Sequence, residues 1–345
     1  MKKRQLLATS TLALAVLSSS ALANFAVYDD TNHLYTGVSL DVYHFGTPDL
    51  GVGSTSNSNN TVLTNISTSG NALMPSLTVG YHFNNDFLSG LFGTKANIEL
   101  NGSFASYSSS ESKANLGTGY YRLINGSAGY LDTSTADMTN FHAKTNSTYH
   151  QINVMFRGDH ESQTQMITQH PEFGFVYGQL TQDTDYGMQW LTNPGINAST
   201  YKNNVSEDIS TNYAGLAFGD AMKVQVSRHF FTNLGAQLQL LHASASLSGS
   251  QTETATTPAG DLPNNTAKAS DSLSSVTYRG IITAGVDYAF TIKPDSPSIG
   301  VNVGYDRLGF TPTVDNPTGS NNKAAHLEAK GSNNFFAGVN VHLPL

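Results

Sequence analysis

The chain contains no cysteine. Disulfide bonds, a thiol nucleophile, a cysteine-ligated metal and acylation on a cysteine are therefore excluded. In an oxidising compartment such a chain must be stable without covalent cross-links. The acidic and histidine residues follow none of the spacings typical of metal sites, so we expect neither a metal nor a cofactor.

Long hydrophobic runs are scarce. The one apolar stretch, Leu6 to Leu17, follows three basic residues at positions 2–4 and precedes an Ala-Leu-Ala segment at 21–23. This order is typical of a secretory signal peptide, so we expect removal of residues 1–23 and a single domain over 24–345. Beyond it, no segment approaches the roughly 20 apolar residues of a membrane helix, which excludes a helical membrane protein.

Charge is also sparse. Charged residues make up 12% of the chain, and 25 acidic residues outnumber 17 basic ones, for a formal net charge of −8. Nucleic-acid-binding proteins usually present a basic surface, so we expect no nucleic-acid partner. The low charged fraction also argues against a disordered polyelectrolyte.

The carboxyl-terminal segment, by contrast, alternates regularly between apolar and polar residues. One face carries Phe335, Ala337, Val339, Val341, Leu343 and Leu345. This pattern is typical of the closing strand of a membrane β-barrel, because lipid tolerates only structures whose backbone groups are all paired. The segment predicts an outer-membrane barrel inserted by the machinery that reads such terminal strands.

The same period-two alternation predicts about ten strands along the chain. They are Leu34–Phe45, Leu73–Phe83, Thr94–Tyr107, Thr148–Arg157, Glu172–Gln182, Asn212–Phe230, Leu234–Leu240, Ser275–Thr291, Ile299–Asp306 and Asn334–Leu345. A bulge is expected at Gly219-Asp220, where the sixth and longest strand could change register. An even number of strands places both termini on the same side of the membrane.

Connections between the predicted strands alternate in length. Turns are expected at 84–86, 158–171, 231–233 and 293–297, and long polar loops at 46–72, 108–147, 183–211, 248–274 and 311–332. Short periplasmic turns and long outer loops characterise outer-membrane barrels. We therefore expect an all-β antiparallel transmembrane barrel of about ten strands. Twelve strands would form if Gly119–Leu131 and Tyr186–Leu191 added a pair, and a soluble β-sandwich is the remaining alternative.

Aromatic residues gather at the strand ends next to the short turns. An interface girdle is expected there, formed by Tyr81, Phe83, Phe87, Phe156, Phe230, Phe231, Tyr288 and Phe290. Such girdles place amphipathic rings at the membrane surface.

Several short motifs resemble the major outer-membrane proteins of the Legionella and Coxiella type. The segments that carry the resemblance are 79–84 (VGYHFN), 173–177 (FGFVY), 213–219 (YAGLAFG), 226–230 (VSRHF) and 233–236 (NLGA). Members of that family are regarded as pore-forming. The resemblance implies a porin in the Gram-negative outer membrane, with ion transport and passive diffusion of small hydrophilic solutes. This chain lacks the cysteine that members of the family often contain, and it has Leu345 where many outer-membrane proteins end in Phe or Trp.

Polar residues on the inward face of the predicted strands are the candidate lumen lining. They are Asp41, Glu99, Gln151, Asn153, Arg157, Lys223, Gln225, Gln237, Gln239, Arg279, Asp287, Asn302, Asp306, Asn340 and His342. Two interpretations stay open. The residues could line a water-filled passage and set its solute preference, or they could pair with one another and fill a closed lumen.

Other functions remain as alternatives. The long polar loops could act in adhesion or in binding a host molecule while the barrel stays closed. His44, His150 and His242 lie near the predicted outer strand ends with Asp183 and Asp185, but no motif links them to a nucleophile, so we expect no enzyme. The expected partners are outer-membrane lipid, lipopolysaccharide and solutes, and a homo-oligomer is left open.

Overall fold

The computed structural model describes residues 33–54, 62–83, 95–118, 137–161, 166–192, 199–291, 297–315 and 326–344. The predicted signal peptide and the segment 119–131 lie outside these residues. The strands are β1 (His33–Phe45), β2 (Leu50–Ser54), β3 (Val62–Ile66), β4 (Gly70–Phe83), β5 (Lys95–Thr118), β6 (Asp137–Glu161), β7 (Ile167–Thr192), β8 (Ser199–Gln225), β9 (Phe230–Thr257), β10 (Gly260–Asp261), β11 (Asn265–Ala289), β12 (Ser298–Asp315) and β13 (His326–Pro344).

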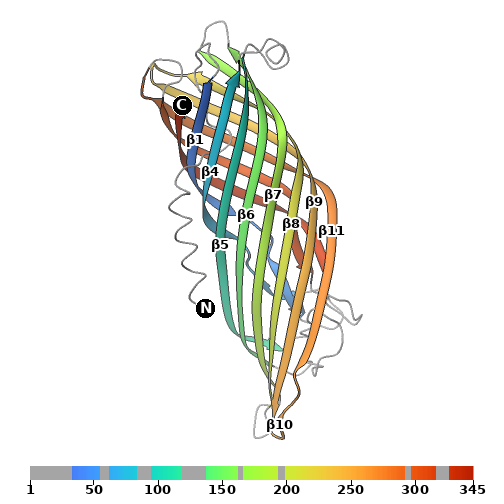
Figure 1. Ribbon diagram of the computed structural model, residues 1–345. Coiled ribbons are helices and arrows are strands. Elements are labelled where there is room, and N and C mark those ends of the chain that lie inside the picture. The colour runs from blue at the N-terminus through green and yellow to red at the C-terminus, as the bar shows by residue number, and fades with distance from the viewer. Residues whose placement is uncertain are drawn as a thin grey trace.

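Ten long strands close into an antiparallel barrel (Figure 1). The 11-stranded sheet runs β10-β9-β11-β12-β13-β1-β4-β5-β6-β7-β8, and β8 pairs back onto β9. β10 is a two-residue strand within the β9–β11 connection. As the sequence predicted, the terminal strand closes the ring on the first, with Leu40 opposite Val339.

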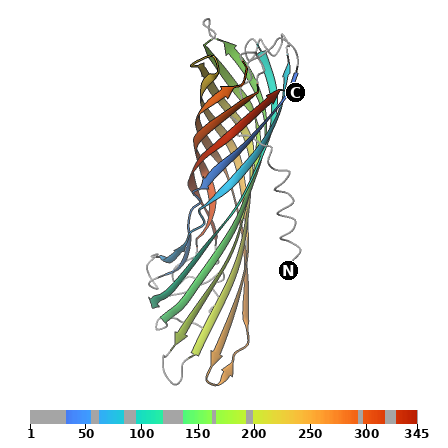
Figure 2. The ribbon, with the colours of Figure 1, turned by 90° about the vertical axis from the view of Figure 1, so that its left-hand side faces the viewer.

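The barrel wall is much taller on one side (Figure 2). β5 to β9 and β11 have 24 to 28 residues each, whereas β1, β4, β12 and β13 have 13 to 19. A membrane-spanning strand needs only about 9–11 residues, so the tall side rises well beyond one bilayer. The β2–β3 hairpin follows the short strand β1 and contacts β12.

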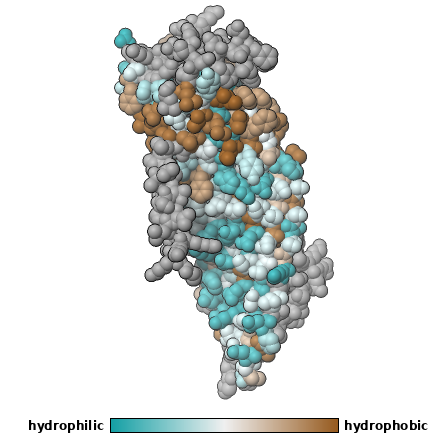
Figure 3. All heavy atoms as spheres, in the orientation of Figure 1, coloured by the Kyte–Doolittle hydropathy of each residue, from teal (hydrophilic) through white to brown (hydrophobic). Residues whose placement is uncertain are grey.

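Apolar side chains form a belt near the end of the barrel that holds the carboxyl terminus, and Figure 3 shows one face of this belt. Large exposed side chains form it on every long strand: Leu34, Leu40 and Val42 of β1, Leu73, Leu77, Val79 and Tyr81 of β4, Leu100 and Phe104 of β5, Ile152 of β6, Ile167, Phe175 and Tyr177 of β7, Leu216 and Phe218 of β8, Phe230, Leu234, Leu238 and Leu240 of β9, Val276, Tyr278, Ile282, Val286 and Tyr288 of β11, Ile299, Val301 and Val303 of β12, and Phe335, Val339 and Leu343 of β13. The polar alternate positions point inward. An outward apolar band over a polar interior is the arrangement of a transmembrane barrel.

The polar stretches predicted as long outer loops are largely strands instead. Beyond the belt, β5 to β9 and β11 continue as Ala105–Thr118, Asp137–Tyr149, Gly178–Thr192, Ser199–Tyr213, Leu241–Thr257 and Asn265–Ser275. We call these segments the extramembrane sheet. Beyond the membrane edge the alternation inverts, because the outer face is now polar and exposed while the inner face packs a buried hydrophobic core.

Three smaller expectations were also wrong. The turn expected at 231–233 lies at 226–229, and Phe231 is buried inside the barrel rather than in the girdle. The bulge expected at Gly219-Asp220 is absent, because the pairing of β8 with both neighbours runs through these residues without a shift. Tyr186–Leu191 continues β7 and adds no further strand.

Of the expected girdle, Tyr81, Phe230, Tyr288 and Phe290 are exposed at the belt edge near the short turns. Phe230 and Phe290 each meet the Tyr288 ring edge-on, with centroids 5.1 Å and 5.6 Å apart. Among the residues that the structure describes, none forms a helix long and apolar enough to cross a membrane.

Two outward positions of β9 test where the bilayer ends. Leu238 lies in the belt and Ser246 lies in the extramembrane sheet, both exposed. We expect Leu238→Arg to lower the free energy of unfolding by about 2 kcal/mol, since a charge facing lipid is costly, and Ser246→Arg to leave it unchanged. Urea titration of the refolded protein in lipid vesicles measures both. Equal losses would place the membrane edge elsewhere.

Candidate functional site

The candidate site is the polar interior of the barrel at the level of the belt. Fourteen of the fifteen lumen candidates are buried there: Asp41, Glu99, Gln151, Asn153, Arg157, Lys223, Gln237, Gln239, Arg279, Asp287, Asn302, Asp306, Asn340 and His342. Gln225 is half-buried at the last position of β8.

Arg157 forms the centre of one layer of contacts. Its guanidinium lies 2.8 Å from Glu99 Oε2 and donates from Nε to Glu172 Oε2 at 2.8 Å. Tyr35 OH donates to Glu99 at 2.6 Å, and Gln237 Nε2 donates to Glu172 at 2.7 Å. The layer therefore joins β1, β5, β6, β7 and β9 across the interior.

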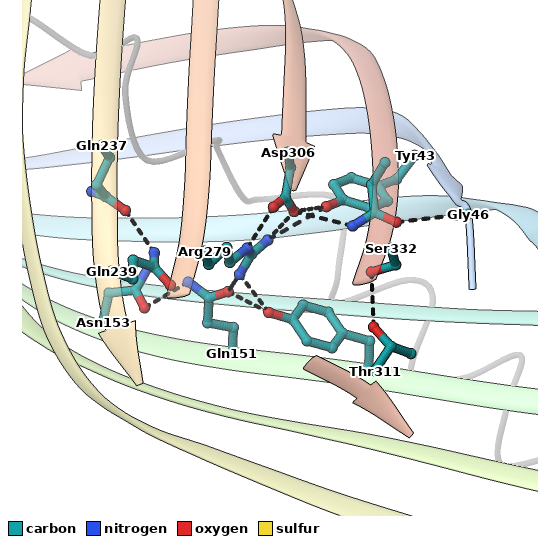
Figure 4. Close-up of polar contacts among 12 residues, drawn as sticks. Tyr43, Gly46, Gln151, Asn153, Gln237, Gln239, Arg279, Asp306, Thr311 and Ser332 are labelled. Atoms are coloured by element: carbon teal, nitrogen blue, oxygen red, sulfur yellow. Dashed lines mark hydrogen bonds and ion pairs between the residues drawn. The ribbon is translucent and has the colours of Figure 1, made fainter. Parts of the chain in front are cut away.

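Arg279 forms the centre of a second layer (Figure 4). Its Nε and Nη2 bind the two oxygens of Asp306 at 2.9 Å and 2.6 Å, a bidentate geometry that favours a strong pair. Nη1 donates to Tyr149 OH at 2.7 Å and also to Gln151 Oε1. Tyr43 OH donates to Asp306. Because these partners come from β1, β6, β11 and β12, this layer also spans the barrel.

A third group lies nearer the short turns. His170 Nδ1 and Asp159 Oδ1 are 2.5 Å apart and both are buried. The Lys223 ammonium lies 4.4 Å from the centre of the Phe231 ring, a cation–π contact. Asn233 and Asn340 donate to Asp287, the latter at 3.4 Å.

Among the described residues, two small cavities lie between these side chains. A cavity of about 60 Å³ is lined by residues that include Asp41, Ser76 and Thr283, and another of about 20 Å³ is lined by Phe45, Tyr213 and others. Arg279, Tyr43 and Tyr149 line both. Spaces of this size hold a few water molecules rather than a sugar or an amino acid.

Inside the extramembrane sheet the lumen contains a hydrophobic core. Its buried core includes Tyr107, Phe141, Met188, Ile209, Leu247, Phe310 and Leu327, with Ile66 from the β2–β3 hairpin. Among the described residues, two buried carboxylates lie in this part, Glu207 and Glu253. Glu207 has 2% of its surface exposed and accepts a hydrogen bond from Tyr186 OH at 3.2 Å. Burial raises the pKa of Glu207 to about 7, although the bond from Tyr186 opposes the shift.

The outer face of the extramembrane sheet is a regular array of short polar side chains. One row across six strands contains only hydroxyls: Ser106, Thr148, Thr181, Ser210, Ser246 and Ser272. The next row contains Ser108, Asn146, Asp183, Asp208, Ser248 and Ser270. Partial burial, together with the charges of Asp208 and Asp185, raises the pKa of Asp183.

The residues considered for an enzyme do not form a common site. His44 lies on β1, where its Nδ1 is 2.8 Å from Asn71 Oδ1. His150 pairs in register with Gln179, and His242 with Ala214, so each faces a neighbour other than Asp183 or Asp185.

Sequence reasoning missed several members of the lumen layers. These are Tyr35, Tyr43, Tyr149, Asp159, His170 and Glu172. The ambiguous alternation of β7 hid Glu172, but its even-numbered parity with Gly174, Val176 and Leu180 marks it as inward-facing. The tyrosines could be placed on a face, but their partners lie far away in sequence.

Comparison with known proteins gives no family assignment. No family model matches the chain, and no curated protein does either. The resemblance to the Legionella and Coxiella proteins therefore stays a prediction.

Solved structures with a similar course of the chain include three membrane proteins. The outer membrane protease OmpT from Escherichia coli is 9% identical, with a TM-score of 0.37 over 91% of this chain and 96% of that chain. A deletion mutant of TodX, a monoaromatic hydrocarbon channel, is 8% identical, with a TM-score of 0.31 over 96% and 98%. The transport unit of the Escherichia coli autotransporter AIDA-I is 10% identical, with a TM-score of 0.31 over 97% and 96%.

Proposed function

We propose that the protein is an outer-membrane barrel that is closed to free diffusion and acts through its extramembrane sheet. The observation that carries this proposal is the filled interior. Two arginine-centred layers cross the lumen at the level of the membrane, and an apolar core fills it beyond the membrane. Barrels of about eight strands have interiors that their own side chains can fill, whereas the 16 to 18 strands of porins leave an aqueous channel.

The proposed location follows from the signal peptide expected over residues 1–23 and from the closing strand β13. With short turns in the periplasm, the extramembrane sheet stands outside the cell. Its hydroxyl and amide rows begin directly above the apolar belt. In an outer membrane we expect the sugars of lipopolysaccharide at this height. Short hydroxyl side chains suit hydrogen bonding to such sugars or to glycans of another cell. We propose adhesion or partner binding as the role of this face.

Conductance of the refolded protein in planar lipid bilayers tests the closed lumen. We expect no regular single-channel steps, in conditions where a general porin inserted in parallel gives them. Reproducible steps of uniform size would contradict the proposal.

Diffusion of small hydrophilic solutes is the second candidate function. It is favoured by the polar lining and by the cavity of about 60 Å³ at the level of the membrane. This function requires the Arg279 layer to open, because Arg279, Tyr43 and Tyr149 separate the two cavities that they line. If the protein is a channel, Arg279→Ala should increase its conductance in the same bilayers. If the lumen stays packed, the Arg279→Ala variant should show no conductance steps.

A further inference from the structure

The lumen at the level of the membrane contains more acid than base. Six buried carboxylates occupy it, against three buried arginine and lysine side chains: Asp41, Glu99, Asp159, Glu172, Asp287 and Asp306 against Arg157, Lys223 and Arg279. A charge removed from water is costly unless it is paired, so the excess must be met by protons, by cations from solution, or by both.

Asp41 is the carboxylate without a basic partner. Arg157 pairs with Glu99 and Glu172, Arg279 with Asp306, and His170 with Asp159, while Lys223 acts on Asp287. Among the described residues, no side-chain nitrogen of a lysine, arginine or histidine lies within 4.0 Å of the Asp41 carboxylate.

The contacts of Asp41 are neutral. The side chain is fully buried. Ser39 Oγ donates to Oδ2 at 3.1 Å, and the side chain of Asn302 also interacts with the carboxylate. No hydrogen bond of normal geometry reaches Oδ1 from the described residues. Oδ1 lies against Gly338 on β13, where any larger residue would overlap it.

The cavity of about 60 Å³ provides the space for a compensating ion. Asp41 lines it together with oxygen-bearing side chains, namely Ser76, Asn101, Ser103, Asn153 and Thr283. The hydroxyl of Ser76 is buried and forms no hydrogen bond within the described structure. Arg279 also lines the cavity, but its donors point to Asp306, Tyr149 and Gln151. Hard oxygen ligands select alkali and alkaline-earth cations, and a single carboxylate balances one positive charge.

We propose that this cavity binds a monovalent cation, sodium or potassium, with Asp41 as its charged ligand and Ser76 as a neutral one. Water completes the coordination, since the cavity has room for several molecules. The site does not depend on whether the lumen conducts.

Thallium(I), which replaces potassium and scatters anomalously, provides the direct test. We expect crystals of the full chain soaked in thallium nitrate to show an anomalous peak in the cavity beside Asp41. In Asp41→Asn crystals, the thallium concentration needed for equal occupancy should rise on the order of tenfold or more. The control is Asp287→Asn, which removes another buried lumen aspartate that faces a glycine, Gly300, and should retain the peak.

Absence of the peak in the wild-type crystals, or a peak that persists unchanged in Asp41→Asn, would overturn the proposal. A parallel measurement avoids dependence on that variant. At constant ionic strength, replacing N-methylglucamine by sodium should raise the unfolding midpoint of the wild type more than that of Ser76→Ala. Equal responses to sodium would also count against the site, and would leave a proton as the compensating charge.

Discussion

Replacing Arg157 by methionine should lower the free energy of unfolding by about 3–5 kcal/mol, since removing one partner of a buried ion pair leaves its charge uncompensated. The Arg157 guanidinium forms ion pairs with two buried carboxylates, Glu99 and Glu172, so the substitution leaves both without an arginine partner in this layer. Methionine retains most of the side-chain volume, which keeps the effect largely electrostatic. Urea titration of the refolded barrel, followed by the gel shift between folded and unfolded forms, measures the loss.

Two further variants separate the electrostatic cause from altered packing. The triple variant Glu99→Gln, Arg157→Met, Glu172→Gln removes the unpaired charges and should recover most of the lost stability. Lys113→Met breaks an ion pair at the surface of the extramembrane sheet, where Lys113 Nζ lies 2.6 Å from Glu111. That exposed pair should contribute at most about 1 kcal/mol. If the single and triple variants were equally destabilised, lost packing rather than charge would explain the result.

The sequence predicted the part of the fold that touches lipid. All ten strands were located, and the closing pair of β1 with β13 was predicted, because one face of each strand must be apolar over the bilayer. That constraint ends at the membrane edge. Ser244, Ser246 and Ser248 alternate with Ala243, Ala245 and Leu247 in a pattern too weakly apolar to predict a strand, so the predicted strand ends at Leu240 whereas β9 continues to Thr257.

The candidate site was predicted by position but not by partner. The alternation of apolar and polar residues along β5 and β11 was enough to predict that Glu99 and Arg279 face the lumen. The contacts between Arg279 and Tyr149, or between Tyr35 and Glu99, join residues 130 and 64 positions apart. Such pairs depend on the stagger between strands in the closed sheet, and the periodicity of a single strand does not reveal this stagger.

Glu207 should make stability depend on pH in the opposite sense to an ordinary carboxylate. Its pKa is raised to about 7 in the folded protein by burial, whereas an unfolded glutamate has a pKa near 4.5. The folded state therefore holds the proton more tightly. Its contribution is fully present below about pH 4.5 and is lost as the pH rises through 7.

The cost of ionising Glu207 should reach about 3 kcal/mol above pH 7, from 1.36 kcal/mol per unit of pKa difference. Glu207→Gln keeps a hydrogen-bond acceptor for Tyr186 without titrating. It should therefore remove this part of the pH dependence between pH 4.5 and 7.5, and should exceed the wild type in stability at the upper end. Asp261→Asn, an exposed substitution on β10 of the same sheet, serves as the control. The measurement is the urea unfolding midpoint of each protein between pH 4.5 and 7.5. If the midpoints of the wild type and Glu207→Gln changed with pH in parallel, Glu207 would be hydrated and ionised within the folded barrel, and the prediction would be wrong.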